Sequence, residues 1–290
     1  MNLKGLDRLR EKLPAYPGRK IVLLPLRGVA AMILAYLGLV LLDILPRLFS
    51  SVELLAAAEP FIPLLGSLLV AGLAYWLIGK LWSRREVMKA TYGNLAYQKM
   101  IPTGITGVCL VPPLVFHAFT SIRSLPPGPP VNVLTVQWSQ SLLVVLGVPA
   151  GVDLWLRVGL AVLLFGLGVL TVRSALLTFG IDYMTVVYLY FPEESEVQQH
   201  DIYSILRHPA YFAVTLMGAA GLVFRCSVYS ILMFIIVYAL LRLHIAREEK
   251  ELIARFGSSY REYMKGVPAL HIRPRSVRSF FRFLKNRQAK

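Results

Sequence analysis

The sequence predicts an all-α fold, a multi-pass transmembrane bundle of about six spans. Of its 290 residues, 56% are hydrophobic and only 16% are charged, whereas charged residues make up about 25% of an ordinary soluble domain. Several apolar runs approach the roughly 20 residues that a helix needs to cross a bilayer. Lys and Arg residues are concentrated in alternate segments between these runs. These three features exclude an ordinary soluble domain and favour a membrane protein.

The six expected spans follow one another along the chain. They lie at about 28–46, 61–82, 104–121, 153–173, 210–224 and 228–246, and the fifth is short. The Pro-rich region 122–138 is expected to form an irregular outer loop. The stretch 139–150 is apolar but ends with Gly and Pro. It is therefore either a re-entrant or interfacial piece or the start of a long tilted helix.

The distribution of basic residues predicts the orientation in the membrane. Six Lys or Arg residues lie in 1–20, five in 80–103 and thirteen in 242–290, whereas 47–60 and 122–138 hold one each. By the positive-inside rule, both termini are expected to face the cytoplasm. The membrane would be the cell membrane in a prokaryote or the endoplasmic reticulum in a eukaryote.

The basic excess is not interpreted as nucleic-acid binding, because most of the formal net charge of +15 lies in segments that set the topology. The tail at 273–290 is expected to bind anionic lipid. We divide the rest into an N-terminal membrane region at 1–138 and a core at 139–272. The two cysteines, Cys109 and Cys226, are too few for a disulfide framework or a thiolate metal site, and no metal site is predicted.

Isolated polar residues inside the expected spans are given structural roles. His117 follows two prolines and is interpreted as a packing histidine with satisfied hydrogen bonds rather than as a cavity ligand. Asp153 and Arg157 are spaced i, i+4 at the start of a span, where a helix N-cap and a local ion pair account for both.

A first cluster of polar and aromatic residues lies at the start of the fifth span. The sequence there reads DIYSILRHPAY and includes Tyr203, Arg207, His208 and Tyr211. Pro209 suits the first turn of a helix, because its φ is fixed and its missing N–H would be unpaired there anyway. The Arg-His pair is thus expected beside helix-start amides, which favour anions.

A second cluster follows the last span, where residues 244–268 have helical periodicity. The apolar stripe consists of Ile245, Leu252, Phe256, Tyr260 and Met264. Glu251 is expected to pair with Arg247 and Arg255 at i, i+4 spacing. Glu248 instead lies on the stripe, with no basic residue three or four positions later. A carboxylate there needs a cation from elsewhere, and the ammonium group of a bound ligand would serve.

The very short connection at 225–227 predicts an antiparallel hairpin, which brings both clusters to the same cytoplasmic end. The combined groups are Arg207, His208, Glu248, Glu249, Tyr203 and Tyr211. They are complementary to a zwitterionic ligand with an aromatic part. The same residues also fit an interfacial charge network with an aromatic belt, and spacing alone leaves both interpretations open.

At these residues the sequence resembles the isoprenylcysteine carboxyl methyltransferase family and its phospholipid methyltransferase relatives. The family pattern is RHPxY, then a helical hairpin, then EExxLxxxFGxxYxxYxxxVP. The matching residues are Arg207-His208-Pro209-Ala210-Tyr211, Glu248-Glu249, Leu252, Phe256-Gly257, Tyr260, Tyr263 and Val267-Pro268, within a resemblance that covers about 153–272. It implies a membrane-embedded S-adenosylmethionine-dependent methyltransferase without a Rossmann domain. In agreement, the compact glycine pair Gly166-x-Gly168 lies inside an apolar span.

The resemblance also implies roles for individual residues. Those expected to hold the cofactor S-adenosylmethionine are Val197, Gln198, Tyr203, His208, Pro209, Ala210, Tyr211, Glu248 and Glu249. Arg207 and Glu248 are expected to be catalytic, and His244 and Arg247 to face the substrate. Two departures from the family pattern are Asp201-Ile202-Tyr203 in place of a Gly-x-Tyr turn, and His244 in place of a substrate-facing Arg.

The implied function is methyl transfer to a lipidic or prenylated substrate, with carboxyl O-methylation of an isoprenylcysteine-like acceptor as first choice. One alternative is N-methylation of a phospholipid head group, which would need a base such as His244 or Glu249. A second is an NADPH-dependent sterol reductase, which shares an RHPxY-like step but usually lacks EExxLxxxFG. A third is a non-catalytic scaffold that binds anionic lipid, which does not account for Glu248.

Overall fold

The computed structural model describes residues 4–120 and 129–286, and in these residues every regular element is a helix. Five helical stretches of this described part are long and apolar enough to cross a membrane: Gly18–Leu48, Ile62–Ser83, Arg85–Phe119, Ala150–Phe179 and Val228–Phe256. A shorter apolar helix spans Pro209–Arg225. Each expected span overlaps one of these helices, so the structure confirms the multi-pass helical bundle.

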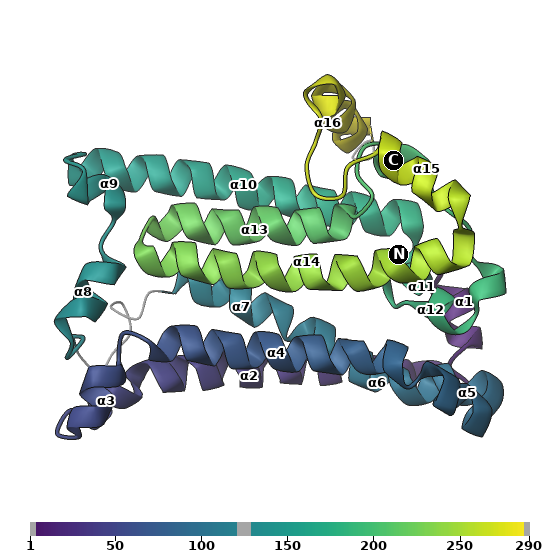
Figure 1. Cartoon of the computed structure of the whole chain (residues 1–290), viewed down its shortest axis with the longest axis horizontal. Coiled ribbons are helices and arrows are strands. Elements are labelled where there is room, and N and C mark those ends of the chain that lie inside the picture. The colour runs from purple at the N-terminus through teal and green to yellow at the C-terminus, as the bar shows by residue number, and fades with distance from the viewer. Residues whose placement is uncertain (1–3, 121–128, 287–290) are drawn as a thin grey trace.

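The bundle helices form two layers. One layer contains α2 (Leu23–Leu48), α4 (Ile62–Ser83) and α6 (Ala96–Cys109), and the other contains α10 (Ala150–Phe179), α13 (Pro209–Arg225) and α14 (Val228–Phe256) (Figure 1). A short helix, α7 (Val111–Phe119), contacts α2, α13 and α14 and so connects the layers. Large apolar side chains such as Leu34, Leu69 and Trp155 are 70%, 71% and 76% exposed on the outside. This outer surface suits contact with lipid rather than water.

We call one end of the bundle the basic end. It holds α1 (Leu6–Glu11), α5 (Arg85–Tyr92), α11 (Ile181–Met184), α12 (Val187–Tyr190) and α15 (Ser258–Gly266) (Figure 1). The opposite end holds α3 (Glu53–Ala58), α8 (Val133–Ser139) and α9 (Leu142–Val145). The segments rich in Lys and Arg thus share one end, as the predicted topology requires. That this end faces the cytoplasm stays a prediction.

Short helical turns complete the described chain. The 3₁₀ turns are η1 (Gly18–Val22), η2 (Gly93–Leu95), η4 (Pro192–Glu194), η5 (Asp201–Ser204) and η6 (Pro274–Ser276). The last helix, α16 (Val277–Asn286), lies outside the two layers and crosses their direction, and it packs on η5 and α10 (Figure 1).

The predicted hairpin of α13 and α14 is present. Pro209 is the first residue of α13, as expected, and His208 precedes it with non-helical backbone. The turn uses Cys226 in the left-handed region, with φ 46°. A capping box follows, in which the Ser227 and Ser230 side chains each accept a hydrogen bond from the other's backbone N–H. Local sequence therefore determines both ends of this connection.

The structure corrects two sequence predictions about the connections and excludes one of the two alternatives for 139–150. Region 122–138 is not wholly irregular, because α8 begins after Asn132, whose Oδ1 accepts a hydrogen bond from Leu134 N–H at 2.9 Å. Its residues 122–128 lie outside the described residues. The stretch 139–150 is not the start of the long helix, because it contains the separate helix α9, and Pro149 precedes α10.

The second correction concerns the helical periodicity of 244–268. Gly257 has φ 57° and separates α14 from α15, so the expected single helix is two. A left-handed residue after a helix is a common stop, and glycine adopts it without a Cβ clash. Tyr260 and Tyr263 are thereby carried on a separate helix.

Candidate functional site

A cavity of about 470 Å³ lies between the two layers toward the basic end. Its polar part is lined by Val197, Gln198, Tyr203, His208, Tyr211 and Glu248. Its apolar part continues between α6 and α7 on one side and α10 and α13 on the other, and is lined by Ile105, Val108, Pro112, Phe116, Phe165 and Met217. The cavity is therefore amphipathic, and most of the residues expected to hold a cofactor lie on its polar side.

Besides Glu196, one further carboxylate of the described residues lines this cavity, that of Glu248. Its Oε1 accepts a hydrogen bond from the Tyr188 hydroxyl at 2.8 Å, and its Oε2 lies 3.8 Å from His208 Nδ1. Within the residues that the structure describes, no Lys or Arg nitrogen lies within ion-pair distance of it. The structure thus agrees with the sequence on the missing cation, and it shows a carboxylate with capacity for a positively charged ligand.

Glu249, the next residue, is occupied by partners from the protein. Its Oε1 accepts a hydrogen bond from Arg207 Nε at 2.8 Å and lies 3.1 Å from His208 Nε2. Arg207 also donates to the backbone carbonyls of Met264, at 3.1 Å, and Val267. Arg207 lines the cavity, but Glu249 does not. This network ties the start of α13 to α14 and α15, and it holds the His208 ring at the cavity wall.

Aromatic side chains form much of the polar part of the wall. The ring of Phe179 lies 4.7 Å from that of Tyr203 and 4.3 Å from that of Tyr183, centroid to centroid. Tyr260 from α15 also lines the cavity. Such rings offer faces against which a planar heteroaromatic ligand can stack.

The tyrosines near Glu248 remain protonated at neutral pH. Burial raises the pKa of Tyr188 well above its ordinary value, and the negative charge of Glu248 raises it further. Burial and the same carboxylate also raise the pKa of Tyr203. For this reason Tyr188 is a hydrogen-bond donor to Glu248 and does not compete with it as an anion.

His244 and Arg247, the predicted substrate-facing residues, point in different directions. His244 lines the cavity, is buried, and has a ring Nε2 with no hydrogen-bond partner in the described residues. The Arg247 guanidinium lies 4.0 Å from the Tyr75 ring centroid, against α4, and Arg247 does not line the cavity. The predicted pair of Arg247 with Glu251 is wrong: Glu251 binds Arg85 at 2.6 Å and Arg255 at 3.0 Å.

The segment before α13 supplies residues that the sequence interpretation missed. Val197 and Gln198 line the cavity as expected, but Thr185, Val186 and Tyr188 line it as well. Val186 has φ 55°, a strained conformation for a β-branched residue. The aromatic run VYLYF at 187–191 was the available signal, but no local spacing relates Tyr188 to Glu248, sixty positions later.

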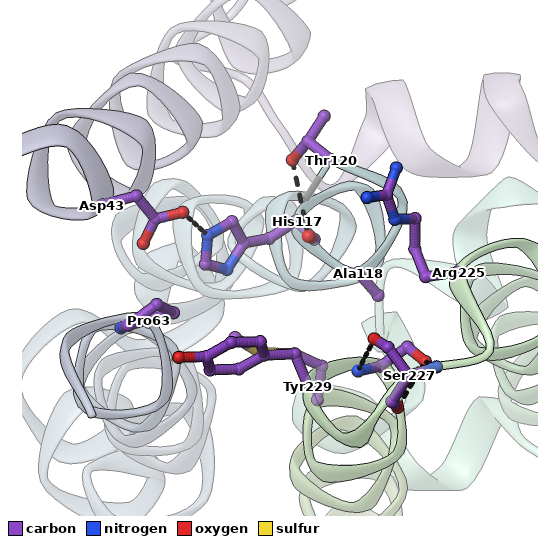
Figure 2. A pocket seen from close by; sticks show the side chains of 10 residues that line it. Asp43, Pro63, His117, Ala118, Thr120, Arg225, Ser227 and Tyr229 are labelled. Carbon is purple, nitrogen blue, oxygen red and sulfur yellow. Dashed lines mark hydrogen bonds and ion pairs between the residues drawn. The ribbon is translucent and has the colours of Figure 1, made fainter. Parts of the chain in front are cut away.

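A second polar region lies near the opposite end, beside a cavity of about 20 Å³. Figure 2 shows Asp43 and His117 facing each other between helices. His117 Nε2 lies 2.6 Å from Asp43 Oδ2, and its Nδ1 lies 3.0 Å from Ser67 Oγ. This confirms the interpretation of His117 as a satisfied packing histidine, although the sequence did not identify its partners.

The other polar pair inside a span is also present. Arg157 binds Asp153 at 2.8 Å, as predicted, and donates to the backbone carbonyl of Phe224. The predicted N-cap role of Asp153 is wrong, because Pro149 stands at the N-cap and Asp153 lies in the first turn.

Comparisons with known proteins place a family match over this site. Residues 156–259 match the model of the phospholipid methyltransferase family. The chain is also 27% identical over 104 residues to protein-S-isoprenylcysteine O-methyltransferase B of Arabidopsis thaliana, an alignment that covers 36% of this chain and 53% of that protein. The chain thus matches about half the length of this curated relative. No solved structure gives a significant match.

Proposed function

We propose that the protein is an integral-membrane, S-adenosylmethionine-dependent methyltransferase with a lipidic substrate, because residues 156–259 match the model of the phospholipid methyltransferase family. The observation that carries the proposal is Glu248, a largely buried carboxylate that faces the large cavity and has no Lys or Arg partner in the described residues. A ligand with both an ammonium group and an aromatic ring would supply the missing positive charge and contact the aromatic wall. The Arabidopsis relative named above supports the same class of reaction.

The residues of the polar part fit S-adenosylmethionine group by group. Glu248 would bind its ammonium, and His208 with the first-turn N–H groups of α13, at Ala210 and Tyr211, would bind its carboxylate. Phe179 and Tyr203 would hold the adenine ring. Pro209 fixes the start of α13, and Val197 and Gln198 would close the adjoining wall. When bound, the cofactor supplies a methyl group activated by a positively charged sulfur.

Arg207 and Glu249 then have supporting roles in the proposal. Since Glu249 is bound to Arg207 and lies 3.1 Å from His208, we assign it to positioning rather than to direct contact with the cofactor. Arg207 lines the cavity while being held by Glu249 and two carbonyls. Its fixed positive charge would favour binding of the cofactor carboxylate and of an acceptor carboxylate at the polar part of the cavity.

The apolar part of the cavity is where we place the acceptor's hydrocarbon chain. Carboxyl O-methylation of an isoprenylcysteine-like acceptor is our first choice, because a carboxylate is ionised at neutral pH and needs no base. The protein would then act by positioning the two reactants and excluding water. The unpartnered Nε2 of His244 is available to donate a hydrogen bond to the acceptor carboxylate.

A second acceptor class is the amine of a phospholipid head group. Its amine must lose a proton before it attacks, and His244 is the candidate base, because its Nε2 lacks a partner in the described residues and the residue lines the cavity. Glu249 is a poorer candidate since its carboxylate is bound to Arg207.

Titration calorimetry of the full-length protein in nanodiscs tests the cofactor. We expect saturable binding of S-adenosylmethionine and none of NADPH. Saturable NADPH binding with no binding of S-adenosylmethionine would instead support the sterol-reductase alternative and overturn the proposal. Binding of neither ligand would leave the non-catalytic scaffold.

The acceptor is tested with a lipid extract and a methyl-labelled cofactor. A carboxyl methyl ester releases labelled methanol in mild base, whereas an N-methylated head group retains its label. We expect release, and full retention of the label would favour the amine acceptor.

We also propose that the basic tail lies on an anionic membrane surface. On α16, Arg278 and Arg282 are exposed beside Val277 and Phe281, which are 39% and 51% exposed. An exposed apolar and basic surface of this kind favours the headgroup region of anionic lipid. Fluorescence of a probe attached near α16 would show whether it senses anionic nanodiscs more than neutral ones.

A further inference from the structure

The N-terminal residues 4–13, which we call the N-terminal strap, cross the segment that forms one wall of the large cavity. Ile181 N–H donates to the Lys4 carbonyl at 2.9 Å, and Lys4 Nζ donates to the Thr178 carbonyl at 2.5 Å. The crossing is very close at two glycines. A Cβ on Gly5 would lie 1.8 Å from Asp182 Oδ1, and one on Gly180 would lie 3.1 Å from the Lys4 carbonyl oxygen.

Opposite charges hold the strap to the other end of this segment. Glu194 binds Lys12 at 2.5 Å and Arg8 at 3.1 Å, and its carbonyl accepts a further hydrogen bond from Arg8 at 2.7 Å. Arg8 also lies 3.4 Å from Asp182. The hydrogen bond from Lys12 is the largest influence that lowers the pKa of Glu194. The strap thus grips residues at both ends of 181–194.

Apolar contacts accompany the ion pairs. Leu9 and Leu13 are buried in one cluster with Tyr97, Leu189 and Phe191. The Lys12 ammonium lies 4.1 Å from the centroid of the Phe191 ring. Because these contacts exclude water around the segment, the strap is packed against it rather than attached by surface charges alone.

The gripped segment carries Tyr188, the hydroxyl donor to Glu248. It also carries Val186, whose left-handed backbone is strained and persists only if the surroundings hold it in place. Tyr97 supplies one such restraint, since its hydroxyl donates to the Thr185 carbonyl at 3.1 Å. The strap, which grips residues on both sides of Val186, supplies others.

We propose that the N-terminal strap is part of the cofactor site, and that Glu194 is a positioning residue which holds the 181–194 wall so that Tyr188 meets Glu248. The inference rests on the proposed function, because the ligand at Glu248 is taken to be S-adenosylmethionine. It extends the functional unit beyond residues 156–259, the range of the family match. Affinity for the cofactor would then depend on residues 4–13, which lie far along the sequence from the range of the family match.

The test uses the full-length protein in nanodiscs and two matched pairs of variants. Glu194→Gln removes the charge that Lys12 and Arg8 bind, and Glu193→Gln changes its exposed neighbour. Gly5→Ala places a Cβ against Asp182. Its control, Gly18→Ala, also adds a Cβ at a glycine with positive φ, 55°, but no atom lies within 4 Å of that Cβ. We expect Glu194→Gln to bind S-adenosylmethionine about 2- to 5-fold more weakly, as loss of a partly exposed ion pair predicts. We expect a similar loss in Gly5→Ala, because its Cβ would displace Asp182.

Hydrogen exchange and thermal unfolding distinguish positioning from general destabilisation. We expect faster amide exchange across 181–194 in Glu194→Gln, an unchanged unfolding temperature of the bundle, and controls that behave as the unaltered protein. The difference in affinity should shrink at high salt, because the lost contacts are ionic.

Two results would overturn different claims. If the unaltered protein binds S-adenosylmethionine and both strap variants bind and exchange equally well, the strap proposal fails and the proposed function stands. If the unaltered protein does not bind S-adenosylmethionine, the proposed function fails. Exchange alone then decides whether the strap holds the wall: equal exchange in Glu194→Gln overturns it, and faster exchange supports it.

Discussion

Two carboxylates near opposite ends of the bundle, the buried Asp43 and the partly buried Glu248, have different partners. Asp43 lies 2.6 Å from the His117 ring (Figure 2). The other nitrogen of that ring lies 3.0 Å from Ser67 Oγ. Glu248 accepts a hydrogen bond from the neutral Tyr188 hydroxyl, and its nearest basic group is His208, at 3.8 Å. The protein therefore supplies a close basic partner for Asp43 and none as close for Glu248.

The two carboxylates also differ in the space beside them, which is small at Asp43 and large at Glu248. The cavity next to Asp43 measures about 20 Å³, which is room for about one water molecule, whereas Glu248 faces about 470 Å³. A second buried pair, Arg47 with Glu59, also lies toward the opposite end. Polar groups that bind one another fix the positions of helices, and a polar group left without a charge partner at a large cavity is available to a ligand.

The largest effect is expected from His117→Ala, which breaks the closed network. Asp43 would remain buried without its basic partner, and breaking such a pair costs about 3–5 kcal/mol of unfolding free energy. Thermal or denaturant unfolding in detergent measures this loss. Cofactor affinity should not change at temperatures where the variant is folded, because the network is remote from Glu248.

The double variant Asp43→Asn with His117→Ala provides the control. Because the double variant removes the Asp43 charge together with its His117 partner, its cost should be smaller than the sum of the two single costs. Simple additivity would show that the two side chains are not energetically coupled, and the contrast with Glu248 would then rest on cavity size alone.

The next largest effect is expected from Glu248→Gln, which keeps the shape of the side chain and removes its charge. Affinity for S-adenosylmethionine should fall by about 2–3 kcal/mol, or roughly 30- to 150-fold, since a charge-assisted hydrogen bond to the ammonium is lost. Calorimetry measures the affinity, and the unfolding temperature should stay the same or rise slightly.

Glu251→Gln is the matched control for Glu248→Gln. Glu251 lies one turn later on the same helix but binds Arg85 and Arg255, and it does not line the cavity. It should leave cofactor affinity unchanged. Equal losses in both variants would contradict a specific role for Glu248 and indicate a general charge effect.

The same contrast explains how much the sequence could predict. The spans, the α13–α14 hairpin, the position of Pro209 and the unusual placement of Glu248 all follow from local features such as run length and helical spacing. The partners of these groups do not. Asp43 and His117 are 74 positions apart, and no periodicity connects them, because their meeting depends on how α2 packs on α7.

The predicted division of the chain shows the same limit of local reasoning. The cavity is lined by residues from the proposed core but also by Ile78, Trp82 and Ile101, which lie in the region 1–138. The sequence of that region resembles nothing in the family pattern. Its contribution arises because α4, α6 and α7 cover the cavity in three dimensions.

The smallest effect is expected from acid titration of Glu194. Its folded pKa is lowered from the ordinary 4.5, first by Lys12 and also by Arg8, so its ion pairs stabilise the strap above about pH 4.5. This contribution is lost as the pH falls through the folded value. Exchange protection of 181–194, corrected for the intrinsic pH dependence of exchange, should stay constant from pH 6 to 8 and decline only under acid conditions. The change should be modest, because the carboxylate is 35% exposed and such pairs contribute about 0–1 kcal/mol.

Glu194→Gln should abolish the acid-dependent part of the exchange protection. If the variant retains it, the titrating group is another carboxylate, and Asp182, which pairs with Arg8 of the strap, is the nearest candidate.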